Sequence, residues 1–162
     1  HVYREQVVQD ILNHWDKTSS GALSAGKREK NVFQAMLAVS GKQAVVHYYN
    51  LFKEKAPHLR VAMTFSRDES NQPGTKEQNE ALKKAIKEYS SCFNVPSLLN
   101  AQEPARAYMI DITKRLARKK PYNQGKDEDR LDLVIVSDQL LTGFDSKYIN
   151  TIYMDKQLRE GC

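Results

Sequence analysis

The sequence predicts an α/β fold in which helices cover both faces of a mainly parallel sheet. Four segments place apolar residues at the three- and four-residue spacings of a helix with one buried face. Short apolar runs without that period lie between them, and their valine and isoleucine content indicates buried strands. The order helix, strand, helix, strand, helix, helix, strand, strand is typical of parallel strands joined by crossover helices.

Each predicted element has its own signal along the chain. The helices carry their apolar residues, in order, at Val8, Ile11, Leu12 and Trp15; Val45, Tyr48, Tyr49 and Phe52; Leu82, Ala85, Ile86 and Tyr89; and Tyr108, Ile112 and Leu116. The strands are predicted in residues 33–39, 59–65, 131–136 and 151–154. Pro57 has no amide donor, so the second helix should end before it. Pro104 suits the first position of the last helix, where that donor is not needed.

The bulk composition is that of one globular domain. The chain has 162 residues, of which 40% are hydrophobic and 28% charged. We expect no membrane segment, because no apolar run approaches the roughly 18 residues that span a bilayer. Charged residues between Arg4 and Asp10 also argue against a signal peptide. Cys92 and Cys162 lie far apart in the sequence, which predicts neither a disulfide nor a zinc site and fits a reducing cytoplasm.

The net charge of +5 and the isoelectric point near 9.1 favour a polyanionic partner. Basic residues form three clusters: Lys27, Arg28 and Lys30; Lys83, Lys84 and Lys87; and Lys114, Arg115, Arg118, Lys119 and Lys120. Taken singly, each cluster is most simply the solvated face of a helix or loop. If several of them converge on one side of the fold, they would hold phosphates.

Two short motifs resemble nucleotide sites and fail on their context. Residues 21–27 have the spacing of a phosphate-binding P-loop, but Arg28 stands where the motif needs Ser or Thr for magnesium. The stretch 127–130 has the composition of an acidic helicase motif. Its acids precede a strand instead of following one, which indicates a solvated turn.

Nuclease and hydrolase sites are equally poorly supported. Asp132, Asp145 and Lys147 imitate the spacing of a metal-dependent nuclease, but no second acidic ligand accompanies Asp145. The four histidines, His1, His14, His47 and His58, show no metal-ligand spacing and no nearby nucleophile. We therefore assign no catalytic residue and no metal ligand to this chain.

The loop that follows the predicted strand 131–136 carries the strongest functional signal. Ligands of open parallel sheets bind where the strands end. Here Ser137, Thr142 and Asp145 supply polar groups, and Gly143 lets a backbone or phosphate approach closely. The alternative is a tight turn capped by Asp145. After the first strand, residues 40–42 (Ser-Gly-Lys) open a helix, where amides and the helix dipole favour anions.

The same loop carries a family resemblance. Residues 140–145 (LLTGFD) look like motif V of superfamily-2 helicases, and together with residues 153–156 (YMDK) they resemble the motor subunit of type I restriction enzymes. Further segments follow the same family pattern: residues 33–39 with Ala44, His47, Tyr48 and Tyr49; residues 59–66; Glu88, Tyr89 and Phe93; and residues 111–115. The resemblance covers nearly the whole chain.

The resemblance implies that residues 1–162 form the second RecA-like lobe of a DNA translocase, a three-layer sandwich truncated before the arginine-bearing motif VI. Gly143 and Asp145 would face the ATP cleft. DNA contacts would come from Ser40, Gly41, Lys42, Ser137 and Thr142. ATP and Mg²⁺ would act only in the full-length motor, because the P-loop lysine, the magnesium acid and the arginine finger are missing here.

The implied partners are double-stranded DNA, the first RecA-like lobe of the same subunit, and methyltransferase and specificity subunits in the cytoplasm of a bacterium or archaeon. In addition to a nuclease, two alternative functions remain open. The chain could be a lobe of another superfamily-2 helicase, or it could be a catalytically silent docking module that binds a protein through a basic helix over residues 114–120.

Overall fold

The computed structural model describes residues 2–24, 34–65, 76–137, 149 and 151–155. Its helices are α1 (Val2–Ser24), α2 (Lys42–Lys55), α4 (Lys76–Phe93) and α5 (Pro104–Leu116), with the short 3₁₀ helices η1 (Pro96–Leu98) and η2 (Asp127–Asp129). Its strands are β1 (Ala35–Val39), β2 (Val61–Thr64), β3 (Leu133–Ser137) and β4 (Thr151–Asp155). The predicted order of helices and strands is confirmed.

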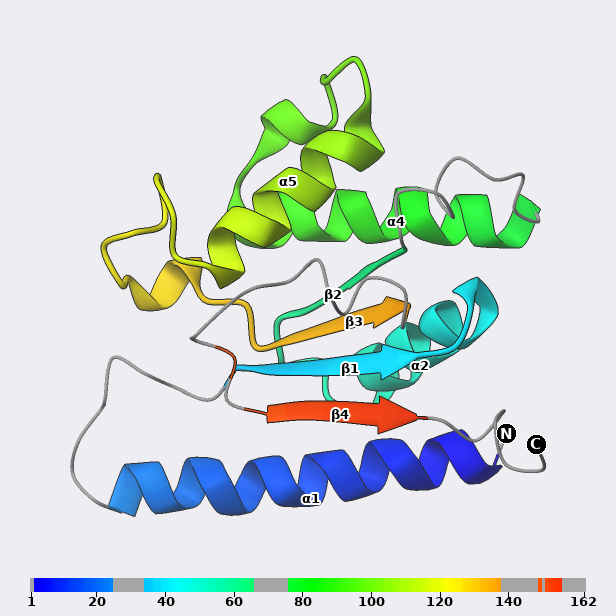
Figure 1. Cartoon of the computed structure of the whole chain (residues 1–162), viewed down its shortest axis with the longest axis vertical. Coiled ribbons are helices and arrows are strands. Elements are labelled where there is room, and N and C mark those ends of the chain that lie inside the picture. The colour runs from blue at the N-terminus through cyan, green and yellow to red at the C-terminus, as the bar shows by residue number, and fades with distance from the viewer. Residues whose placement is uncertain (1, 25–33, 66–75, 138–148, 150, 156–162) are drawn as a thin grey trace.

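The strands form one parallel sheet in the order β2-β3-β1-β4. Figure 1 shows the four arrows pointing in one direction, with α1 beyond β4 and with α4 and α5 beyond β2. We call the edge where the parallel strands end the carboxyl end of the sheet, and the edge where they begin the amino end. The predicted α/β fold with a parallel sheet is confirmed.

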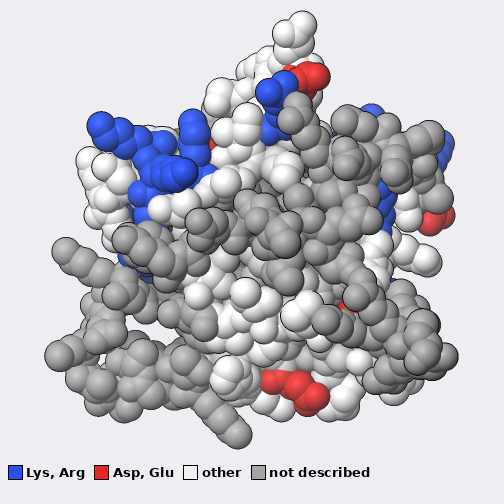
Figure 2. All heavy atoms as spheres, in the orientation of Figure 1, with Lys and Arg blue, Asp and Glu red and all other residues white. Residues whose placement is uncertain are grey.

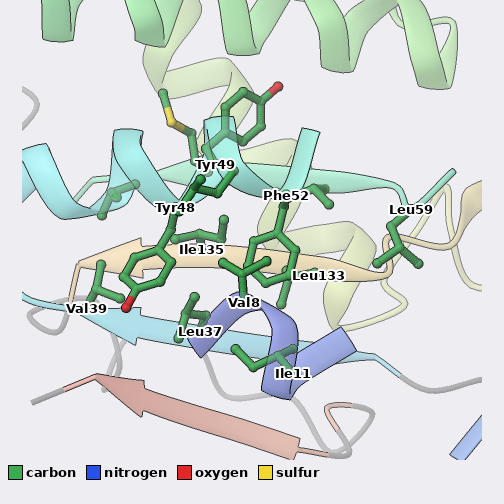
Figure 3. Packing of buried hydrophobic residues seen from close by; sticks show 14 of the residues in the cluster. Val8, Ile11, Leu37, Val39, Tyr48, Tyr49, Phe52, Leu59, Leu133 and Ile135 are labelled. Carbon is green, nitrogen blue, oxygen red and sulfur yellow. The ribbon is translucent and has the colours of Figure 1, made fainter. Parts of the chain in front are cut away.

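Alternate residues of the strands face two separate cores. One face, with Leu37, Leu133 and Ile135, packs against α1 and α2; Figure 3 shows Val8 and Phe52 over these strand residues. The opposite face packs against α4, α5 and η1 through residues such as Val134. Helices therefore cover both faces of the sheet, as expected for a three-layer sandwich. Burial of each large aliphatic side chain contributes about 1.5–3 kcal/mol.

The outermost strand differs from the prediction of a fully buried strand. In β4 the side chain of Tyr153 packs on the core of α1 and α2, whereas Ile152 and Met154 point the other way and remain 52% and 45% exposed. The reason is its position at the edge of the sheet, where the described helices α4 and α5 do not reach its second face. The alternation of β4 is that of a half-buried strand.

Helix boundaries follow the proline signals. Helix α2 ends at Lys55, before Pro57, and α5 begins at Pro104, as predicted. Residues 21–24 of the P-loop lookalike lie inside α1, which rules out a phosphate loop there. None of the helices in the described ranges combines the length and apolar character needed to cross a bilayer.

The end of α5 corrects the expected basic helix over residues 114–120. The helix stops at Leu116, and Arg118 takes a left-handed backbone with φ of 51°. The amide of Lys119 donates to the carbonyl of Lys114 at 2.9 Å, and the amide of Arg118 to that of Arg115 at 3.3 Å. This pair of bonds is the Schellman motif, which usually has glycine at the left-handed position.

Candidate functional site

Four strand ends meet at the carboxyl end of the sheet. Val39 of β1 is in register with Ser137 on one side and with Asp155 on the other. Phe65 follows β2 beyond the pair formed by Thr64 and Val136, and it is buried. Polar groups from β1, β3 and β4 therefore lie side by side at the edge where parallel sheets bind ligands.

The segment 40–42 joins β1 to the first turn of α2. Gly41 is the N-terminal cap, with φ of 86° and ψ of 161°, a conformation that is open essentially only to glycine. A Cβ atom added at Gly41 would meet nothing within 4 Å, so the glycine serves the backbone turn and not a close contact. Gly41 itself has no side chain that could cap the helix, and no acidic residue lies in the first turn of α2. The N-terminal end of α2 is thus electropositive.

Lys42 is held over this edge by an aromatic contact. Its ammonium lies 5.6 Å from the centre of the Phe65 ring, across the sheet from β1 to the end of β2. A cation over an aromatic face is attracted by the ring quadrupole. The contact fixes a positive charge beside the first turn of α2, where an anion would be bound.

The other predicted site residues have different outcomes. Ser137 has no exposed surface, so its side chain cannot contact DNA in this conformation. Thr142, Gly143 and Asp145 lie outside the described residues, as does Lys147. Of the predicted DNA contacts, the structure thus brings residues 40–42 to the carboxyl end in an accessible position.

Asp155, which was part of the family-like run but received no role from the sequence, is a hydrogen-bond hub at the same edge. Its carboxylate accepts from the Tyr48 hydroxyl of α2 at 2.5 Å and from the Tyr3 hydroxyl of α1 at 3.4 Å. Burial, and then the bond to Asp155, raise the pKa of Tyr48 far above its ordinary value, so the phenol stays a donor at neutral pH. A strand-end aspartate opposite a tyrosine is the signal that could have found this hub.

His47 and Arg4 extend the hub towards α1. Arg4 Nη1 lies 2.8 Å from His47 Nδ1, and the Arg4 guanidinium lies 5.8 Å from the centre of the Tyr48 ring. Because arginine can only donate, Nδ1 must accept and is therefore unprotonated. Burial, and then the charge of Arg4, lower the pKa of His47 from 6.5. The first turn of α1 is thereby tied to α2 and β4.

A second polar network lies between α4 and α5 and corrects the interpretation of Arg115 as part of a solvated basic face. Arg115 is only 2% exposed. Its Nη2 pairs with Asp111 at 3.1 Å, and its Nε donates to the Tyr89 hydroxyl at 2.8 Å. Its guanidinium also stacks on the rings of Phe93 and Tyr122, at 3.9 and 3.8 Å from their centres. Arg115 and three of its partners, Tyr89, Phe93 and Asp111, carried the family resemblance, and their role here is structural.

Asp132 of the rejected nuclease motif and Asp127 of the rejected helicase motif lie at the amino end of the sheet. Asp132 is buried; it accepts from the backbone amide of Arg60 at 2.8 Å and from Arg130 Nε at 3.1 Å. Asp127 pairs with Arg130 in η2, which is a turn before β3 and not a strand end. The part of the chain that the structure describes contains no cluster of three residues able to hold a metal. These acids are structural.

Comparisons with known proteins agree with the family resemblance. Residues 31–161 match the family model for type I restriction enzyme subunit R domain 3. The chain is similar to the type I restriction enzyme SauCOLORF180P endonuclease subunit of Staphylococcus aureus (strain COL), with 26% identity over 95% of this chain and 16% of that protein. The SsaAORF53P endonuclease subunit of Staphylococcus saprophyticus is 29% identical over 78% of this chain and 14% of its own length.

This chain therefore spans only a small part, 16% and 14%, of the curated relatives it matches. The family model, in contrast, covers most of the chain, from the residues before β1 to those after β4. The Tyr89, Phe93 and Asp111 network and the strand-end Asp155 both fall within the matched residues. The chain belongs to the family of type I restriction enzyme subunit R domain 3.

Proposed function

We propose that this chain is the second RecA-like lobe of the ATP-dependent DNA translocase of a type I restriction enzyme, and that its carboxyl end contributes to DNA grip and to the ATP cleft. The observation that carries the proposal is the electropositive start of α2. There the glycine cap, the amides of the first helical turn and Lys42 stand at the strand ends of a parallel sheet. Such a site suits phosphate oxygens.

In this proposal, residues 40–42 contact the phosphates of the tracked strand, and Thr142 contacts them from the segment that follows β3. Asp145 and Gly143 face the nucleotide. Phosphate contacts carry little sequence information, which suits a motor that moves along any DNA. ATP and Mg²⁺ are held mainly by the first RecA-like lobe, so we expect no hydrolysis by this chain alone.

The wider assembly is part of the same proposal. The first lobe closes the cleft from the other side, a specificity subunit reads the target sequence, and methyltransferase subunits sense modification. The matched relatives are endonuclease subunits of bacteria, for which we propose a cytoplasmic place of action. Cleavage belongs to a nuclease domain outside this chain.

The test uses a full-length motor subunit that carries this chain. Lys42→Ala and Thr142→Ala are each expected to lower the DNA-stimulated ATPase rate at least several-fold, while the unfolding midpoint stays close to that of the wild type. Lys55→Ala, at the far end of α2 and exposed, is the charge-matched control and should keep the wild-type rate. Wild-type turnover in both test variants would remove the coupling role from this edge.

A further inference from the structure

The last residues of α5 and the turn that follows them concentrate positive charge at the amino end of the sheet. We call residues 114–126 the basic turn. Its surface cations are Lys114, Arg118, Lys119, Lys120 and Lys126, and no acidic residue interrupts it. Arg115 Nη1 donates to the Asp129 carbonyl just ahead of β3 at 3.1 Å, which fixes the turn beside the amino end. Figure 2 shows lysine and arginine atoms gathered on this side of the molecule.

Most of this charge is not neutralised within the described structure. Lys114, Lys119 and Lys120 are exposed, and no described carboxylate pairs with them within 4.0 Å. Lys126 reaches Glu128 at 4.0 Å. Two lysines of α4 differ, because Lys83 and Lys84 lie 3.9 and 3.8 Å from Glu80 and Glu88. The basic turn therefore carries more unneutralised positive charge than the surface of α4 around Lys83 and Lys84.

The turn is also held in one shape by the buried network beneath it. The amide of Tyr122 donates to the Lys119 carbonyl at 2.8 Å, and the amide of Lys119 to the Lys114 carbonyl at 2.9 Å. The Tyr122 hydroxyl donates to Asp111, and the Tyr122 ring stacks on Arg115. The cations thus stand on a preformed scaffold, which lowers the entropy lost when a ligand binds.

Arg118 occupies a backbone position that favours glycine. Its φ of 51° places it in the left-handed region, at the position after the helix where glycine is the usual residue. Helix α4 ends in the same manner at Asn94, with φ of 54° and a bond from the Val95 amide to the Ser90 carbonyl. Asparagine tolerates this conformation well, whereas arginine does not. A strained backbone that keeps a large cation on the surface points to a binding role.

We propose that the basic turn binds the phosphates of a DNA backbone, as a second contact at the opposite end of the sheet from residues 40–42. The chemistry of the surface favours DNA over a protein partner. Protein interfaces have apolar and aromatic centres and few lysines. Here lysines dominate, and the aromatic side chain of Tyr122 is buried against Arg115. Such a surface contacts phosphates without reading bases.

The decisive variant is Arg118→Gly, because stability and binding should move in opposite directions. Glycine relieves the left-handed strain, so the urea midpoint of the chain should stay equal or rise. Affinity for a short labelled DNA duplex should fall, equally for unrelated sequences, and the slope of log K against log salt should flatten by about 0.9. A purely structural role of Arg118 would leave binding unchanged.

The lysines are tested together, with Lys114→Gln, Lys119→Gln and Lys120→Gln in one chain. The salt slope should flatten by about 2.7 if each contacts one phosphate. The control is Lys83→Gln with Lys84→Gln, whose charges already face Glu80 and Glu88; it should alter the slope far less. Equal effects of the two sets would overturn the proposal, and so would the absence of DNA binding by the wild-type chain at about 0.05 M salt.

A competition experiment separates DNA from an acidic protein surface. Polyglutamate of matched total charge should displace labelled duplex from the wild-type chain only weakly. Displacement as effective as that by unlabelled DNA would identify an acidic protein partner and overturn the assignment to DNA. Failure of this proposal can be told apart from failure of the proposed function. Lys42→Ala tests the carboxyl end and changes no residue of the basic turn.

Discussion

At the scale of single residues, two arginine side chains connect helices of the structure, one of them buried and the other near the surface. Arg115 is enclosed between α4 and α5, where its guanidinium donates to Tyr89, Asp111 and the Asp129 carbonyl. Arg4 is at the surface of α1 and reaches His47 and Tyr48 of α2. The first is a buried ion pair with additional stacking, and the second is a helix-to-helix bond that depends on the protonation of a histidine.

Arg115→Met should destabilise the fold strongly. The substitution leaves Asp111 without its cation in a nearly enclosed site, and the loss of one partner of a buried pair costs about 3–5 kcal/mol. Urea unfolding measures the effect. The matched control on the same helix is Arg106→Met, which breaks an exposed pair with Glu103 and should cost about 1 kcal/mol or less. Similar costs for both variants would contradict the structural role of Arg115.

His47 should make stability depend on pH. Its folded pKa is lowered by burial and then by Arg4, partly offset by Glu5, so the folded state favours the neutral ring. That contribution is complete above the ordinary value of 6.5 and is lost as the pH falls through the folded pKa. His47→Asn keeps an acceptor near Nδ1 without a titrating group.

The measurement is the free energy of unfolding in urea at about pH 7.5 and about pH 5.5. The wild type should lose stability on acidification, and His47→Asn should lose less. His58→Asn, on the exposed turn after α2, serves as the control and should retain the wild-type loss. An unchanged pH dependence in His47→Asn would show that the bond to Arg4 tolerates the charged ring.

At the scale of elements, the start of α2 is the most constrained junction of the candidate site. β1 must turn sharply into the helix, and Gly41 makes that turn with a positive φ of 86°. The turn sets the direction of the first amides and places Lys42 over Phe65. Sequence alone located this segment, since a strand followed by Ser, Gly and Lys predicts a helix start with room for an anion.

Gly41→Ala should therefore destabilise the chain by about 1–3 kcal/mol, because an L-residue is strained in this conformation even with open space around its Cβ. For a domain of this size the melting temperature should fall by about 2–4 °C per kcal/mol. Ser40→Ala at the preceding position supplies the comparison and should have a smaller effect. A melting temperature unchanged by Gly41→Ala would mean that the helix start adjusts without strain.

At the scale of the whole molecule, the two ends of the sheet carry different surfaces. The carboxyl end has the start of α2 and the Asp155 hub; the amino end has the basic turn and the paired acids before β3. The two proposed phosphate contacts are thus set apart by the length of the strands. In our proposals, the carboxyl end grips DNA and faces the nucleotide cleft, and the basic turn adds a second phosphate contact at the amino end. The variants above address each end separately.

The sequence by itself determined the element order, the apolar strands and the helix boundaries at Pro57 and Pro104. It did so because buried strands and buried helix faces each give a characteristic spacing of apolar residues within a short stretch of sequence. Proline likewise acts on the backbone within a single helical turn. It also located residues 40–42 and the family-like run that includes Asp155. Local pattern is sufficient wherever the physical cause lies within a few residues.

Tertiary structure alone decided the rest. Placement of β1 between β3 and β4 gave Asp155 its partners Tyr48 and Tyr3, and left Ile152 and Met154 exposed on the outer strand. Folding of α5 onto α4 likewise converted Arg115 from a member of a basic cluster into a buried cation. These outcomes depend on contacts between residues far apart in the chain, and no local periodicity records which distant side chain will arrive.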